Sequence, residues 1–139
     1  MISDVATLIF ERKDFFIKLT AEHLGISCIS ILIAAIAGLI LGILISEKTK
    51  LSPFVLGFTS IVYTIPAISM LGFLIPFSGI GNTTAIIALT IYALLPMVRN
   101  THTGMRHIDK DILEAAKGMG STDFEILYKI KLPLAVPVI

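Results

Sequence analysis

The sequence lacks tryptophan, contains one cysteine, and carries charge on only 15% of its 139 residues. Without tryptophan, an aromatic belt at a membrane interface has to be built from Tyr and Phe. Cys28 cannot form an internal disulfide, and its apolar neighbours favour a packing role. Soluble domains average about 25% charged residues, so this composition, with a mean hydropathy of +0.93, indicates a membrane protein. The net charge of +1 gives no reason to expect a nucleic-acid partner.

Motifs for catalysis are also missing. No Gly-x-x-x-x-Gly-Lys-Ser/Thr loop is present, so the chain is not expected to bind ATP by a P-loop. His23, His102 and His107 have no other metal-binding side chains at suitable spacing, and no metal site is predicted. No nucleophile stands beside a base. We therefore predict no catalytic residues, no cofactor of the chain's own, and a protein that is not an enzyme.

Long uncharged runs predict three transmembrane helices. The first covers about 24–46, and the charge-free stretch 51–98 is long enough for two more, at about 54–75 and 84–98. Ala34, Gly38 and Gly42 stand four residues apart, a spacing that permits close helix packing. Residues 1–23 mix apolar and charged side chains, which predicts an amphipathic segment lying on the membrane surface. A solvated tail leading into the first span is the alternative.

The charged stretch 99–133 follows the third span. Asp111, with Glu114 three residues later, predicts the start of a short helix over 111–119. This helix would have one apolar stripe, made by Ile112, Ala115, Ala116 and Met119. Gly118 and Gly120 are expected to end it. Thr122 and Glu125 then predict a second capping box, opening a helix to about Ile130, and Pro133 would stop that helix or start the next.

The distribution of basic residues predicts the orientation. Eight of the eleven follow the first or third span, three lie among acidic residues in 1–23, and the expected turn at 76–83 has none. The positive-inside rule therefore assigns 99–133 to the cytoplasm and the 76–83 turn and the N-terminus to the outside. An ordinary cytoplasmic loop with two helical turns remains an alternative interpretation of 99–133.

The second span is the candidate translocation path. Pro66 removes a backbone hydrogen bond in mid-span, and polar groups stand close to it. We take Tyr63, Thr64, Pro66 and Ser69 as candidate path residues. The alternative is that such hydroxyl groups bond back to the backbone or hold helices together.

One motif in the charged stretch resembles a known family. Glu114-Ala115-Ala116, Gly120, Ile130, Leu132 and Pro133 match the EAA loop of bacterial ABC importer permeases. The resemblance implies an all-α, polytopic membrane helical bundle of the type I (MetI-like) permease class. It also implies that the loop, with Lys117, docks into a separate cytoplasmic ATPase, which would bind the ATP and Mg²⁺. Tyr63-Thr64-Ile65-Pro66-Ala67 and Ala93-Leu94-Leu95-Pro96 are similar to the osmoprotectant branch, whose members carry glycine betaine, carnitine or choline.

Further expectations follow from the resemblance. Residues 134–139 begin a fourth apolar run, and permeases of this family have helices beyond the loop, so the chain is expected to be truncated there. The expected partners are a homologous or identical second permease, an extracellular or fused substrate-binding protein, and the bilayer of a bacterial cell membrane. Two alternatives stay open. One is a permease for amino acids such as methionine, and the other is a small self-associating, holin-like membrane protein.

Overall fold

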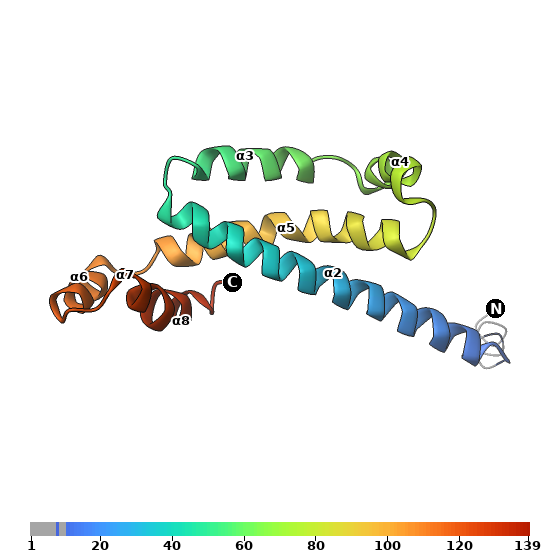
Figure 1. Ribbon diagram of the computed structural model, residues 1–139. Coiled ribbons are helices and arrows are strands. Elements are labelled where there is room, and N and C mark those ends of the chain that lie inside the picture. The colour runs from blue at the N-terminus through green and yellow to red at the C-terminus, as the bar shows by residue number, and fades with distance from the viewer. Residues whose placement is uncertain (1–7, 9–10) are drawn as a thin grey trace.

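The computed structural model describes residue 8 and residues 11–139, and this part of the chain consists of helices joined by short turns (Figure 1). Most of the segment 1–10, where the interfacial prediction begins, lies outside the described residues. The helical architecture confirms the predicted all-α class. The elements are α2 (Lys13–Glu47), α3 (Ser52–Tyr63), α4 (Ala67–Ser78), α5 (Asn82–Arg106), α6 (Lys110–Gly118), α7 (Asp123–Glu125), the π-helix η1 (Ile126–Lys131) and α8 (Leu132–Ala135).

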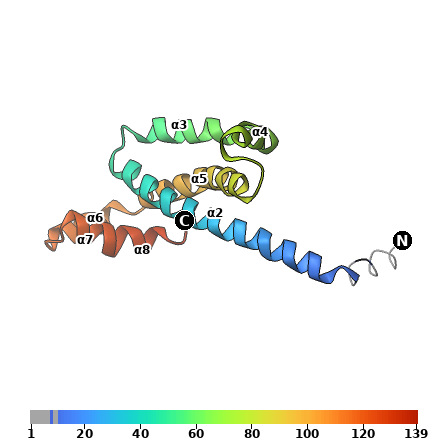
Figure 2. The ribbon, with the colours of Figure 1, turned by 45° about the vertical axis from the view of Figure 1, so that its right-hand side comes forward.

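The pair α2 and α5 forms the centre of the molecule, and the two helices cross in both ribbon views (Figures 1 and 2). Ala34, Gly38 and Gly42 are all buried on the α5-facing side of α2, with Ser30 one step earlier in the same series. A Cβ atom added to Gly38 would lie 2.4 Å from Cβ of Met97. One added to Gly42 would lie 2.5 Å from Cβ of Thr101. The four-residue spacing of small residues is therefore the packing seam between these helices.

The second predicted span is broken, which corrects the expectation of one helix over 54–75. The helices α3 and α4 meet at a bend of 94° across Thr64–Pro66. Pro66 has φ −58° and ψ 140°, so it stands outside both helices. Its ring disfavours helical backbone at Ile65, the residue before it. Each half has 12 residues, or about 18 Å of helix, which is too short to cross the membrane alone.

The two halves together nonetheless follow the whole length of α5. At the start of α3, Ser52 Oγ lies 2.8 Å from Nε2 of His102, near the end of α5. At the end of α4, Ser78 Oγ lies 2.7 Å from Oγ1 of Thr84, near the start of α5. The pair α3–α4 therefore returns from one end of α5 to the other, and we describe it as one broken span rather than a loop that re-enters on the same side.

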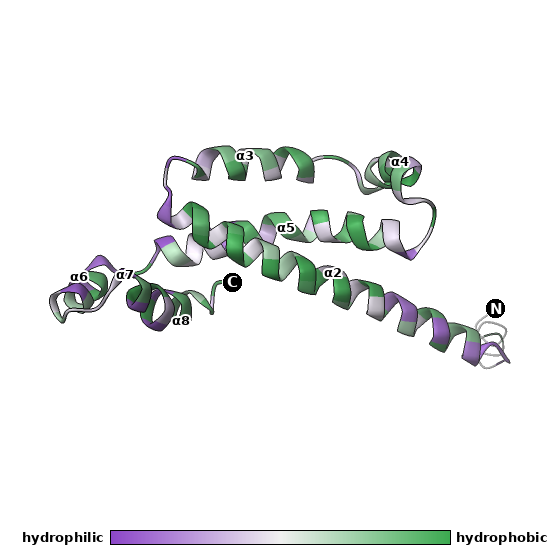
Figure 3. Cartoon of the chain, viewed as in Figure 1, coloured by the Kyte–Doolittle hydropathy of each residue, from purple (hydrophilic) through white to green (hydrophobic). Residues whose placement is uncertain are grey.

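The other predicted boundaries are displaced. Residues 13–23 continue into α2, because no residue between Lys13 and Leu24 breaks a helix, so no separate interfacial element begins there. Figure 3 shows the polar start of α2 giving way to an apolar helix. Asn82 Nδ2 donates to Glu22 Oε1 at 2.5 Å. This bond places the start of α5 beside the last charged residue in the polar part of α2.

The third span is longer than expected. The helix α5 continues through Pro96 to Arg106, well past the predicted end at Val98. The expected turn at 76–83 is reduced to residues 79–81. Helical sequence on both sides of Pro96 outweighs its missing N–H. Residues 134–139 likewise do not begin a new helix. The helix α8 starts at Leu132, continuous with η1, and ends at Ala135.

Candidate functional site

The helix α6 carries most of the predicted coupling residues, and its N-terminus is capped by a different residue from the one expected. Asp109 is the N-cap, and its side chain accepts a hydrogen bond of 3.0 Å from the backbone N–H of Asp111. Asp111 lies in the first turn instead, where its negative charge interacts favourably with the positive end of the helix dipole. Both aspartates fit the sequence pattern of a cap, so the pattern did not decide between them.

The C-terminus of α6 depends on Gly120. This glycine has φ +87°, and its N–H donates to the carbonyl of Lys117 at 2.9 Å. The N–H of Ser121 donates to the carbonyl of Ala116 at 3.1 Å. These two bonds make a Schellman motif, which turns the chain sharply away from the helix axis. The prediction that Gly120 ends the helix is confirmed, whereas Gly118 is still helical.

The predicted apolar stripe of α6 is divided between two environments. Ala116 is 1% exposed and is the buried residue of α6, which packs against η1. Ile112 and Ala115 are exposed, and Met119 is 79% exposed. Ala116 therefore packs within the chain itself, and the outward surface of α6 consists of the other three residues of the stripe.

The predicted capping box at Thr122 is present. Glu125 N–H donates to Thr122 Oγ1 at 3.3 Å, and Thr122 N–H donates to Glu125 Oε2 at 3.1 Å. The backbone hydrogen bond from Thr122, then the bond from Lys129 at 3.0 Å, lowers the pKa of Glu125 to about 2. This carboxylate is therefore fully ionised at neutral pH, which fixes the start of the second helical segment.

Beyond this box the helix changes to π geometry. Ile126–Lys131 forms η1, and the N–H of Leu132 bonds to the carbonyl of Leu127, five residues back. Pro133 lies in the first turn of α8 and has no N–H to offer the carbonyl of Lys129. In an α-helix the proline ring would also clash with that carbonyl. The wider winding of a π-helix before the proline relieves this clash, and π segments recur at functional sites. Ile130 and Leu132 are partly buried, and Pro133 is exposed.

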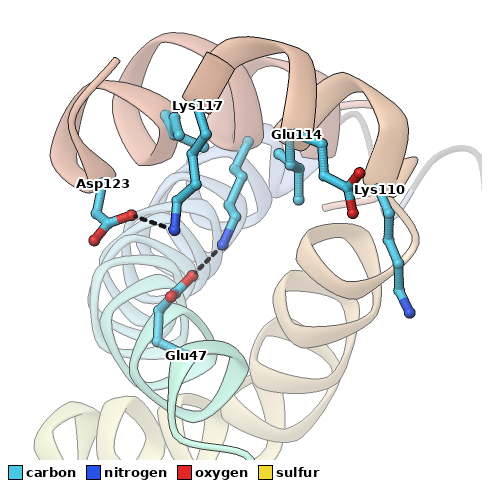
Figure 4. A pocket seen from close by; sticks show the side chains of 8 residues that line it. Glu47, Lys110, Glu114, Lys117 and Asp123 are labelled. Atoms are coloured by element: carbon cyan, nitrogen blue, oxygen red, sulfur yellow. Dashed lines mark hydrogen bonds and ion pairs between the residues drawn. The ribbon is translucent and has the colours of Figure 1, made fainter. Parts of the chain in front are cut away.

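A charged cavity separates α6 from the end of α2 (Figure 4). Its volume is about 320 Å³. Lys131 Nζ bonds to Glu47 Oε1 at 2.6 Å, and Lys117 Nζ lies 3.2 Å from Asp123 Oδ1. The first pair joins the last turn of α2 to η1, and the second joins α6 to α7. The lining residues are Glu47, Lys110, Leu113, Glu114, Lys117, Asp123, Ile126 and Lys131.

The candidate path residues gather at the break between α3 and α4. Tyr63 stacks edge-on with Tyr92 of α5, with ring centroids 5.9 Å apart. Thr64 Oγ1 donates to the carbonyl of Ile61 at 2.7 Å, so this hydroxyl bonds back to the backbone. Pro66 is the break itself, and Ser69 is exposed on α4. Of these four, only Tyr63 lines one of the cavities found in the described part of the chain, which it shares with Tyr92.

Sequence reasoning missed three contributors. Tyr92 was not considered, although it is the tyrosine within the third predicted span. Ser30 extends the spacing of Ala34 by four residues, and that periodicity could have identified it. The pairing of Glu47 with Lys131 had no local signal, because the two residues lie 84 positions apart.

Comparisons with known proteins agree with this architecture. The family model described as "Binding-protein-dependent transport system inner membrane component" matches residues 30–139. The carnitine transport permease protein OpuCB of Listeria monocytogenes is 37% identical over 97% of this chain and 62% of its own length. The glycine betaine/carnitine/choline transport system permease protein OpuCB of Bacillus subtilis is 41% identical over 86% of this chain and 55% of its own length.

A solved structure is similar as well. The MetNI methionine ABC transporter in an inward-facing conformation superposes with a TM-score of 0.74 and 29% identity, over 84% of this chain and 60% of that one. The chain belongs to the family of binding-protein-dependent transport system inner membrane components. This membership excludes the holin-like alternative. The chain spans 55% to 62% of the length of the two curated relatives named above.

Proposed function

We propose that this chain is part of the membrane-spanning permease subunit of an ATP-driven importer, and that it couples to a separate ATPase through α6. The observation that supports this most strongly is the form of α6. It is a short helix with Ala116 packed inward, an exposed face made by Ile112, Ala115 and Met119, and a sharp Schellman turn at Gly120. An outward surface with a small central residue lets another protein approach the helix backbone closely.

Coupling would follow from rigid contact. The ATPase holds ATP and Mg²⁺, and its movement carries α6 with it. The Lys117–Asp123 pair connects α6 to α7, and α7, η1 and α8 continue as one helical segment to Ala135. Motion at α6 therefore reaches α8, which packs against α5 near Gly104. The chain's role is transport rather than catalysis, because hydrolysis belongs to the ATPase.

The proposed cargo is a compatible solute such as glycine betaine, carnitine or choline. Curated relatives at 37% and 41% identity are named for these compounds, whereas the methionine transporter is 29% identical. We further propose that a substrate-binding protein, separate or fused, delivers the solute to a pair of permease subunits. Tyr63, Thr64, Pro66 and Ser69 would lie along the path.

The proposed orientation has α6 in the cytoplasm and the N-terminus outside a bacterial cell membrane. The ends of α2 and α5 lie on one side, because Lys131 on η1 pairs with Glu47 and Ser52 lies beside His102. Basic residues gather on that side, at Lys48, Lys50, Arg99, Arg106 and Lys110. Such clustering marks the cytoplasmic face.

A cross-linking experiment tests the coupling proposal. Cys28 is exposed and is first replaced by serine, and then Met119→Cys, at a position that is 79% exposed, is introduced into the full-length permease in membranes with its ATPase. A thiol-to-amine cross-linker should give a permease–ATPase band whose intensity changes with ATP. The matched control is Ile80→Cys, which is 91% exposed at the opposite end of the bundle and should give no such band. A Met119→Cys band absent in every nucleotide state, with the ATPase bound and folded, would refute the assignment of α6.

A further inference from the structure

A second cavity lies beside the break between α3 and α4, within the membrane-spanning part of the molecule. Its volume is about 290 Å³. Transporters commonly bind cargo near the membrane midplane, where a helix is discontinuous. Tyr92 is near the middle of α5, and Tyr63 is the last residue of α3 before the bend. The residues that line this tyrosine cavity are Ser27, Ser30, Ile31, Tyr63, Leu89, Tyr92 and Ala93.

The two tyrosines are held differently. The hydroxyl of Tyr92 donates to the carbonyl of Ile65, a group next to the break, so this ring is fixed in place. Tyr63 is 51% exposed, and its ring meets that of Tyr92 at 70°. An edge-on pair presents one ring face beside one ring edge. Both rings line the cavity, and about half of Tyr63 is uncovered, so its ring can contact a ligand there.

The polar groups of the cavity favour one kind of cation. None of the seven lining residues is charged. The hydroxyl of Ser30 already donates to the carbonyl of Ile26 at 2.8 Å. A metal ion or a primary ammonium group would need several strong acceptors to replace its water. A quaternary ammonium group makes no hydrogen bonds, and aromatic faces attract it through cation–π interaction.

We propose that the tyrosine cavity is a transit site for the quaternary ammonium group of the cargo, which rests against the faces of Tyr63 and Tyr92 as it crosses the membrane. This inference depends on the proposed function, because it assumes a solute of that class. It adds a recognition site within the permease itself. The site would bind weakly, since a transit site has to release its ligand.

Thiol modification in the assembled importer tests the site directly. Ser27→Cys, in a Cys28→Ser background, supplies one thiol on the cavity wall. Its reaction rate is measured with a methanethiosulfonate that carries a trimethylammonium group and with an uncharged one of equal length. The ratio of the two rates should exceed one, and choline should slow both reactions. Tyr63→Leu should lower the ratio by about fivefold to thirtyfold, the range between an exposed and a desolvated cation–π contact.

Two further variants serve as controls. Tyr63→Phe keeps the aromatic face and should keep the ratio, whereas Phe54→Leu, on the same helix but outside the cavity, should leave it unchanged. Equal rates for both reagents, no reaction with either, or equal ratios for Tyr63→Leu and Tyr63→Phe would each overturn the proposal. The unmodified importer is also tested for ATP-driven choline or glycine betaine uptake. Failure of that uptake refutes the proposed function, whereas normal uptake with equal ratios refutes the transit site alone.

Discussion

A single missing methyl group decides how closely α2 and α5 can pack. At Gly38 a Cβ atom would meet Cβ of Met97 and the backbone of Met97 and Val98, none of which can rotate away. At Gly25, on the same helix, a Cβ atom would meet nothing within 4 Å. The same residue type is therefore required at one position and merely tolerated at the other.

This difference gives a matched prediction. Gly38→Ala should lower the free energy of unfolding by about 1–3 kcal/mol, the usual cost of overpacking. Gly25→Ala should leave it unchanged or raise it by up to about 1 kcal/mol, because alanine favours a helix. Unfolding of the purified protein in detergent, followed by circular dichroism, measures both. Equal stability for the two variants would mean that the helices separate without cost.

Gly120 carries the second prediction at this scale. Its φ of +87° suits glycine, and a left-handed conformation costs other residues about 1–2 kcal/mol. Gly120→Val should insert and fold but lose ATP-driven uptake, because the turn after α6 would change and α6 would point in a different direction. Gly118→Ala is the control, since Gly118 is helical and open. Transport assays in membrane vesicles compare them, and normal uptake by Gly120→Val would refute the docking geometry.

Among the elements, the capping box at Thr122 has a defined pH dependence. Glu125 has a folded-state pKa of about 2, below its ordinary value of 4.5. The carboxylate therefore stabilises the folded segment fully above about pH 4.5, and that stabilisation is lost as the pH falls toward 2. Hydrogen exchange of the Glu125 and Ile126 amides should accelerate across this window, after correction for intrinsic rates. Glu125→Gln should show no such change, and an unchanged profile in the native chain would contradict the box.

The break at Pro66 is a second property of an element. Pro66→Ala restores an N–H and removes the ring that disfavours helix at Ile65, so α3 and α4 should straighten from their bend of 94°. Spin labels at Phe54 and Phe77, both exposed, should then move apart in pulsed electron paramagnetic resonance. Pro76→Ala is the control, because Pro76 lies inside α4 and not at the bend. No change in the Pro66→Ala distance would show that packing against α5 holds the break.

Local patterns predicted local structure well at this scale. The small-residue spacing on α2, the turn at Gly120 and the box at Thr122 depend on residues within a few positions of one another. The bend of 94° and the continuation of α5 through Pro96 depend instead on contacts between distant parts of the chain. Pro66 and Pro96 each remove one backbone hydrogen bond from a helix, but only the tertiary environment decides which proline breaks its helix. The stripe pattern likewise groups Ala116 with three exposed residues although Ala116 is buried, because periodicity identifies a face and not what covers it.

At the scale of the whole molecule, Glu47 and Lys131 connect the bundle to the coupling segment. Their pair spans 2.6 Å, with Glu47 about half exposed, so it should contribute about 0.2–1 kcal/mol. Glu47→Lys should accelerate hydrogen exchange in η1, and the double variant Glu47→Lys with Lys131→Glu should restore slow exchange. Lys48→Glu, at the neighbouring position, is the control. If the double variant exchanged as fast as the single one, the pair would have no role in holding η1.

The seam between α2 and α5 also limits how the molecule can move. Sliding α2 by one turn along α5 would bring Ala34 to the position of Gly38, or Ser46 to that of Gly42. Either shift puts a larger side chain at one of the two points of closest approach, so the observed register is favoured. The broken pair α3–α4 has no comparable close approach of backbones, because a Cβ atom added to Gly57 or Gly72 would meet nothing within 4 Å. In an opening and closing cycle, α3 and α4 would then move relative to a fixed pair of α2 and α5. The contact between Tyr63 and Tyr92 would form in one state and break in the other.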